Sequence, residues 1–84
     1  MNQAEFKHLL GKARSAKEGG LEFWSVQSTG EKVAVALVLN RADWLASIDY
    51  TLAEAIDRTG PEWLALVPIV AKTLRDEEPD DESR

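Results

Sequence analysis

Residues 32–39 have the sequence Lys-Val-Ala-Val-Ala-Leu-Val-Leu, in which an unbroken apolar run follows a single lysine. Large side chains occupy the odd positions, and two alanines and a valine occupy the even positions. A short valine-rich run of this kind is typical of a β-strand. Because both of its faces are apolar, we expect both faces to be covered by other parts of the structure.

The segment before this run predicts a partner strand. Residues 21–27 are rich in bulky apolar side chains and have little helical periodicity. Residues 28–31, Ser-Thr-Gly-Glu, have the composition of a turn, with a glycine available for a positive φ. Residues 21–39 therefore predict a two-stranded antiparallel hairpin. Alternation along its first strand turns Phe23 toward the core and Trp24 toward the opposite face.

A helix is predicted before the hairpin. Apolar side chains recur at helical spacing over residues 6–13. The glycine pair at residues 19–20 ends this helix, since such a pair readily takes the left-handed conformation found at helix ends.

Helices are also predicted after the hairpin. Asn40 is a predicted N-terminal cap, and a capping-box pattern at residues 51–54 indicates a break near residues 49–50. Residues 59–61, Thr-Gly-Pro, end one helix and begin the next. Pro68 is expected to kink or split that last helix.

The predicted order is thus an N-terminal helix, two strands, and two or three C-terminal helices. This order indicates a single small α+β domain over residues 1–76. Residues 77–84 have the sequence Glu-Glu-Pro-Asp-Asp-Glu-Ser-Arg, without an apolar side chain. They predict a disordered acidic tail.

Composition excludes several classes of protein. The 84 residues contain no cysteine, so neither disulfides nor thiolate metal sites are expected. The N-terminus lacks the charge and apolar pattern of a signal peptide. The longest apolar run, at residues 63–71, is far shorter than the roughly 20 residues that span a bilayer. We therefore expect a cytoplasmic protein that does not bind membranes.

Catalytic chemistry has little support in the sequence. His8 is the only histidine, and no second ligand lies at a metal-binding spacing from it. The serines lack a nucleophile-elbow context, and the glycines do not form a phosphate-binding loop. We predict that the protein is not an enzyme and uses no cofactor or metal. An enzymatic alternative would need a cleft that holds His8 beside a carboxylate.

The favoured function is protein binding, by an accessory or adaptor domain whose apolar hairpin face meets a partner. The partner is a second copy in a homodimer, another protein, or both. The net charge of −5 argues against direct binding to nucleic acid. The candidate interface comprises Trp24, Val26, Ala34, Ala36, Val38 and Trp44.

The alternative function belongs to another class. An acidic inhibitor could present carboxylates in place of phosphates to a nucleic-acid-binding protein. Its charges would come from Asp43, Asp49, Asp57, Glu62 and residues 76–82. Contacts of this kind weaken steeply as salt rises, whereas an apolar interface is little affected.

Overall fold

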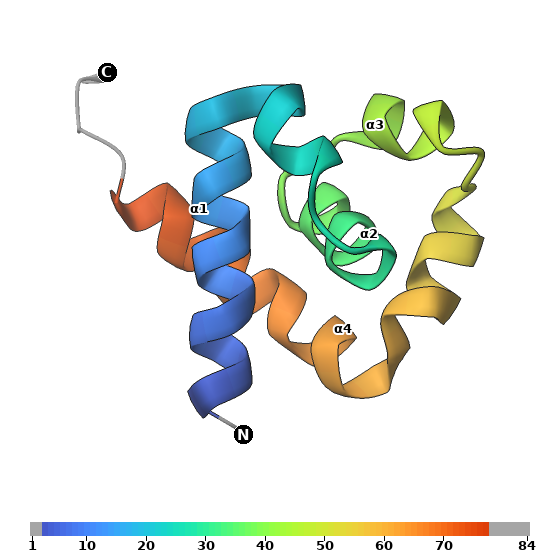
Figure 1. Ribbon diagram of the computed structural model, residues 1–84. Coiled ribbons are helices and arrows are strands. Elements are labelled where there is room, and N and C mark those ends of the chain that lie inside the picture. The colour runs from blue at the N-terminus through green and yellow to red at the C-terminus, as the bar shows by residue number, and fades with distance from the viewer. Residues whose placement is uncertain (1–2, 78–84) are drawn as a thin grey trace, which may run out of the picture.

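The described part of the chain is built from helices and short connections. The computed structural model describes residues 3–77, and it contains four helices and no β-strand within that range (Figure 1). The helices are α1 (Gln3–Ser25), α2 (Thr29–Val38), α3 (Ala42–Ser47) and α4 (Leu52–Glu77). The predicted α+β class is therefore wrong, and the protein is a small all-α domain. The predicted tail falls outside the described residues except for Glu77, which is the last residue of α4.

The residues interpreted as a hairpin turn are the N-terminal cap of α2. The hydroxyl of Ser28 accepts a hydrogen bond from the Glu31 N–H at 3.2 Å. The Glu31 carboxylate in turn accepts one from the Ser28 N–H at 3.0 Å. This reciprocal pair is a capping box, which satisfies two N–H groups that a helix start leaves unpaired. The helix that it begins covers most of the predicted turn and of the predicted second strand.

The apolar run belongs to a central helix rather than to a strand. In Figure 1, α2 lies in the middle of the molecule, and it packs against α1, α3 and α4. Its four consecutive residues 33–36 are at most 1% exposed. A helix that is covered on every side needs apolar residues all round its circumference, as a doubly covered strand does. The expected covering of the run is confirmed, although the element is different.

The helix end predicted at the glycine pair is confirmed at Gly20, where the first part of α1 stops in a backbone conformation of positive φ. Gly20 has φ 72° and ψ −156°, outside the helical region. The helix then resumes in a new direction, toward the right in Figure 1, and continues to Ser25. The strand predicted at residues 21–27 is therefore mostly the last part of α1.

The connection from α2 to α3 differs from the prediction. Asn40 is not the cap of α3 but a linking residue with a positive φ of 58°. Arg41 holds the cap position and makes no side-chain capping bond.

The break between α3 and α4 is confirmed. Thr51 and Glu54 form a second capping box, in which the Glu54 N–H donates to the Thr51 hydroxyl at 3.0 Å. The Thr51 N–H donates to the Glu54 carboxylate at 2.9 Å. This box begins α4 after the short α3.

The last helix bends at the predicted glycine. Gly60, with φ 83° and ψ 160°, is the non-helical residue inside α4, and Pro61 begins the second part. The helix runs through Pro68 without a further non-helical residue, so it is not split there. No helix within residues 3–77 is long and apolar enough to cross a membrane.

Two tryptophans anchor the core beside α2. The rings of Trp24 and Trp44 stack with their centres 5.0 Å apart. The Trp24 indole N–H donates to the carbonyl of Lys32 at 2.9 Å, which satisfies its polar atom in the interior. This pair fixes the end of α1 and the start of α3 against α2.

Candidate functional site

The hairpin face that was expected to form an interface does not exist, and most of its residues lie in the core. Five of the six are at most 7% exposed: Trp24, Ala34, Ala36, Val38 and Trp44. Val26 is instead 82% exposed. The difference follows from the helical geometry, because the last part of α1 turns Trp24 inward and its neighbours outward.

Three large apolar side chains stand at the surface beyond the bend of α1. Leu21 is 52% exposed, Phe23 is 51% exposed and Val26 is 82% exposed. We call these three residues the apolar ridge. The predicted strand placed Leu21 and Phe23 in the core. Successive side chains of a strand point to opposite faces, so Trp24 was expected on the face away from the core.

The glycine pair builds the apolar ridge in two ways. Gly20 redirects the helix, so the ridge leaves the axis of the first part of α1. Gly19 gives the Phe23 ring its place, because a Cβ at residue 19 would lie 2.2 Å from that ring. Neither role was recognised from the sequence, where the pair indicated only a helix end.

A groove opens on the other side of Gly20. It has a volume of about 330 Å³ and lies between α1, the α2–α3 connection and the end of α4. We call it the basic groove, because its charged side chains are all cationic among the described residues. Its lining consists of Ala16, Lys17, Gly20, Val38, Leu39, Arg41, Trp44, Ala71, Leu74 and Arg75.

The three cations of the basic groove have different partners. Arg41 forms a fork with Asp43, with Nε–Oδ1 and Nη2–Oδ2 distances of 3.0 and 2.8 Å. The hydrogen bond from Arg41 lowers the pKa of the Asp43 carboxyl. The Lys17 ammonium lies 3.5 Å from the carbonyl oxygen of Leu74. Arg75 makes no ion pair with any residue between 3 and 77.

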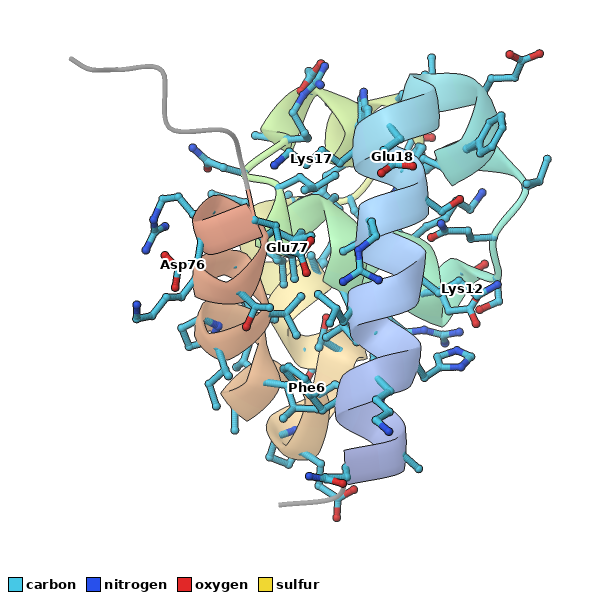
Figure 2. The ribbon with its side chains drawn as sticks, turned by 90° about the vertical axis from the view of Figure 1, so that its left-hand side faces the viewer. Phe6, Lys12, Lys17, Glu18, Asp76 and Glu77 are labelled. Carbon is cyan, nitrogen blue, oxygen red and sulfur yellow. The ribbon has the colours of Figure 1, made fainter. Side chains whose placement is uncertain are left out.

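An ion pair joins the two helices beside the groove. Figure 2 shows Lys17 and Glu77 facing the space between α1 and the last turns of α4, whereas Asp76 points away. Arg14 holds Glu77 with two contacts, one of them from Nε to Oε1 at 3.2 Å. The hydrogen bond from Arg14 lowers the pKa of the Glu77 carboxyl. The pair is exposed, so it helps to orient α4 but adds little stability.

His8 does lie beside a carboxylate. Its Nε2 is 2.7 Å from Oε2 of Glu31, and its ring centre is 5.7 Å from that of Trp63. Burial opposes ionisation of Glu31, but hydrogen bonds from His8 and Ser28 outweigh it and leave the pKa of this carboxyl below its ordinary value. Both oxygens of Glu31 are thus occupied, one by the cap of α2 and one by His8. This cluster joins α1 to α2 and lines a hollow together with Ser28 and Trp63. The geometry that the enzymatic alternative requires is therefore present, and the absence of catalysis stays a prediction.

The carboxylates proposed for an acidic inhibitor are divided by the structure. Asp43 is paired with Arg41, and Asp76 with Lys72 at 3.2 Å. Asp49 and Asp57 line a shallow hollow together with Glu54, Tyr50, Ala53 and Arg58. Residues 78–82 of the predicted set lie outside the described range. No group of three or more histidine, aspartate or glutamate side chains suited to a metal ion occurs within residues 3–77.

The ridge and the groove are therefore the two surfaces with chemistry suited to a partner. The ridge offers apolar area, and the groove offers cations around an apolar floor. Neither places a nucleophile beside a base among the described residues. No protein-family model, curated protein or solved structure matches this chain.

Proposed function

We propose that this chain is a non-catalytic protein-binding domain that meets its partner through the apolar ridge. The observation that supports the proposal is the exposure of Leu21, Phe23 and Val26 within six residues of one another. Exposed apolar area is typical of contact surfaces, and these three side chains come from one short segment of six residues. A cytoplasmic location suits the lack of cysteine.

The energy available from the ridge is sufficient for a specific contact. Full burial of a leucine, valine or phenylalanine side chain contributes about 1.5–3 kcal/mol. Since these side chains are half exposed or more, covering all three would contribute about 3–5 kcal/mol. A contribution of this size matches a small cluster of dominant residues in a protein interface.

The local backbone also supports a binding role. The bend at Gly20 requires a conformation that other residues rarely adopt, and it carries Phe23 and Val26 to the surface. The same bend also brings Trp24 into the core, so this segment contributes both to packing and to the exposed surface. The partner is another protein or a second copy of the chain, and the same surface would serve either.

The test compares Phe23→Ser with Leu52→Ser. Leu52 is 55% exposed on α4, so its replacement removes a similar apolar area from another surface. Each tagged variant is used to capture partners from a lysate of its source cells, and its self-association is measured by light scattering. We expect Phe23→Ser to lose the partner, or the dimer, by about tenfold or more. Equal capture and equal self-association by wild type and Phe23→Ser would refute the proposal.

One observation favours the acidic inhibitor as a second candidate. Asp49, Glu54 and Asp57 line the same hollow, and Arg58 is the cation beside them. A partner that recognises these carboxylates would be lost between low and moderate salt. A partner held by the apolar ridge would remain in both washes.

A further inference from the structure

We propose that the basic groove is a second binding site, which takes an acidic segment of a partner protein with one apolar side chain on the groove floor. This site is separate from the apolar ridge and differs from it in chemistry. It does not depend on the function proposed above.

The charged side chains that line the groove are cationic, although Asp43 offsets the charge of Arg41. The net charge is −5, yet three of the ten lysines and arginines line this one groove. No carboxylate lines it among residues 3–77. Arg75 lines the groove, and a guanidinium can bind a carboxylate with two parallel hydrogen bonds.

The floor of the groove is apolar and rigid. Val38, Trp44 and Leu74 are 7%, 5% and 4% exposed, respectively. Trp44 is held between the Trp24 ring and the Arg41 guanidinium, which lies 4.4 Å from its ring centre. Because these side chains are already fixed by packing, they lose little conformational entropy when a ligand side chain binds against them.

The hollow itself comes from small residues on facing helices. Ala16 on α1 and Ala71 on α4 both line the groove, and their small side chains fill less of the space between the two helices than larger ones would. The volume of about 330 Å³ is at the small end of the range for ligand pockets. It suits one large side chain rather than a whole cofactor.

The positions of the cations favour a peptide over a compact anion. Lys17 stands on α1, Arg75 on α4 and Arg41 before α3, so the positive charges surround the apolar floor from three elements. A ligand with carboxylates on both sides of one apolar group matches this arrangement. An acidic peptide with a central leucine has that pattern, whereas a single phosphate would leave the floor uncovered.

The test uses a synthetic peptide and the full chain. The probe is an acetylated and amidated peptide with a central leucine between two pairs of aspartates, and its control has asparagine in place of aspartate. Binding is followed at low salt by the NMR signals of the three indole N–H groups. We expect a saturable shift of the Trp44 signal and none of the Trp63 signal, since Trp63 does not line the groove. The asparagine peptide should produce no shift.

Variants of the chain make the test specific. Lys17→Gln and Arg75→Gln should each weaken binding of the aspartate peptide by about two- to fivefold. Lys7→Gln, which removes an exposed charge of α1 outside the groove, should leave it unchanged. Equal affinity in all variants, or equal shifts at Trp44 and Trp63, would overturn the proposal.

A last part of the experiment concerns the C-terminal segment of the chain. Residues 78–82 contain four carboxylates that follow α4 directly, and they are candidates for the same groove. A full-length variant with these four residues changed to asparagine or glutamine is titrated in parallel. If the peptide binds only this variant, the groove belongs to the chain's own C-terminal segment and the partner proposal is wrong. Binding to both forms supports it.

Discussion

Gly20→Ala is the substitution that most directly tests the bend of α1. Gly20 has φ 72° and ψ −156°, a combination that residues with a Cβ hardly adopt. A Cβ built at this position meets no atom within 4 Å. Any loss of stability must therefore come from the backbone conformation itself and not from a clash.

The size of the loss follows from the cost of such a conformation. Holding a residue other than glycine in this region costs about 1–3 kcal/mol. A domain of this length has a free energy of unfolding of about 4–12 kcal/mol, so the loss is a substantial fraction. Each kcal/mol lowers the melting temperature of so small a domain by about 4–8 °C.

Gly11→Ala is the matched control. Gly11 is an exposed residue within the regular part of α1, and a Cβ there also meets nothing within 4 Å. Alanine in a helix interior is about 0.5–1 kcal/mol more favourable than glycine, so this variant should be more stable than wild type. Urea titrations followed by circular dichroism compare the two. If both variants change stability in the same direction, the assigned bend at Gly20 is wrong.

Substitutions at three further positions test the core and the cap of α2. Leu9→Ala should lower the free energy of unfolding by about 2–5 kcal/mol, because Leu9 is fully buried. Leu9→Met, which keeps most of the volume, should lower it by less than about 1.5 kcal/mol. Urea titrations measure both changes. Trp24→Phe leaves the Lys32 carbonyl without its indole donor and should cost about 1–3 kcal/mol in the same assay. The pKa of Glu31 lies below its ordinary value of 4.5, so its carboxylate stabilises the fold above that pH, and this contribution is lost as the pH falls through the lowered value. Glu31→Gln should therefore lower the melting temperature at pH 7 and reduce its further fall at acidic pH, and an equal fall in both proteins would contradict the role of Glu31.

Local signals in the sequence predicted several boundaries correctly. The Thr51–Glu54 capping box and the Gly60-Pro61 pair lie where α4 begins and where it bends. Such features depend on residues at most three positions apart, so a single sequence contains all the information they need. The burial of residues 33–36 was likewise predictable, because an apolar run must be covered in either kind of element.

The class of the central element could not be decided in the same way. Residues 28–31 satisfy the chemistry of a hairpin turn and of a helix cap equally well, and an apolar run of this length suits a strand or a central helix. The choice also decides which side chains face outward. A period of two puts Phe23 inside and Trp24 outside, whereas the helix does the reverse. Because residues 28–31 were interpreted as a hairpin turn, residues of the core were assigned to the predicted interface.

The basic groove depends on contacts that no local pattern contains. Lys17 and Leu74, which face each other across it, are separated by 57 positions in the chain. The cations of the first helix were visible in the sequence, but their grouping with Arg41 and Arg75 depends on the packing of α1 against α4. A strongly acidic composition gave no sign of a local cationic site.

The ridge and the groove meet at Gly20, which lines the groove and sets the direction of the ridge. This position permits a test of whether one partner spans both surfaces. Phe23→Ser affects the ridge, and Arg75→Gln affects the groove. If a single partner contacts both, each change should weaken its binding, and the two losses should add in the double variant unless the sites are coupled. If the surfaces serve different partners, each variant should lose only one of them, whereas Gly20→Ala should disturb both.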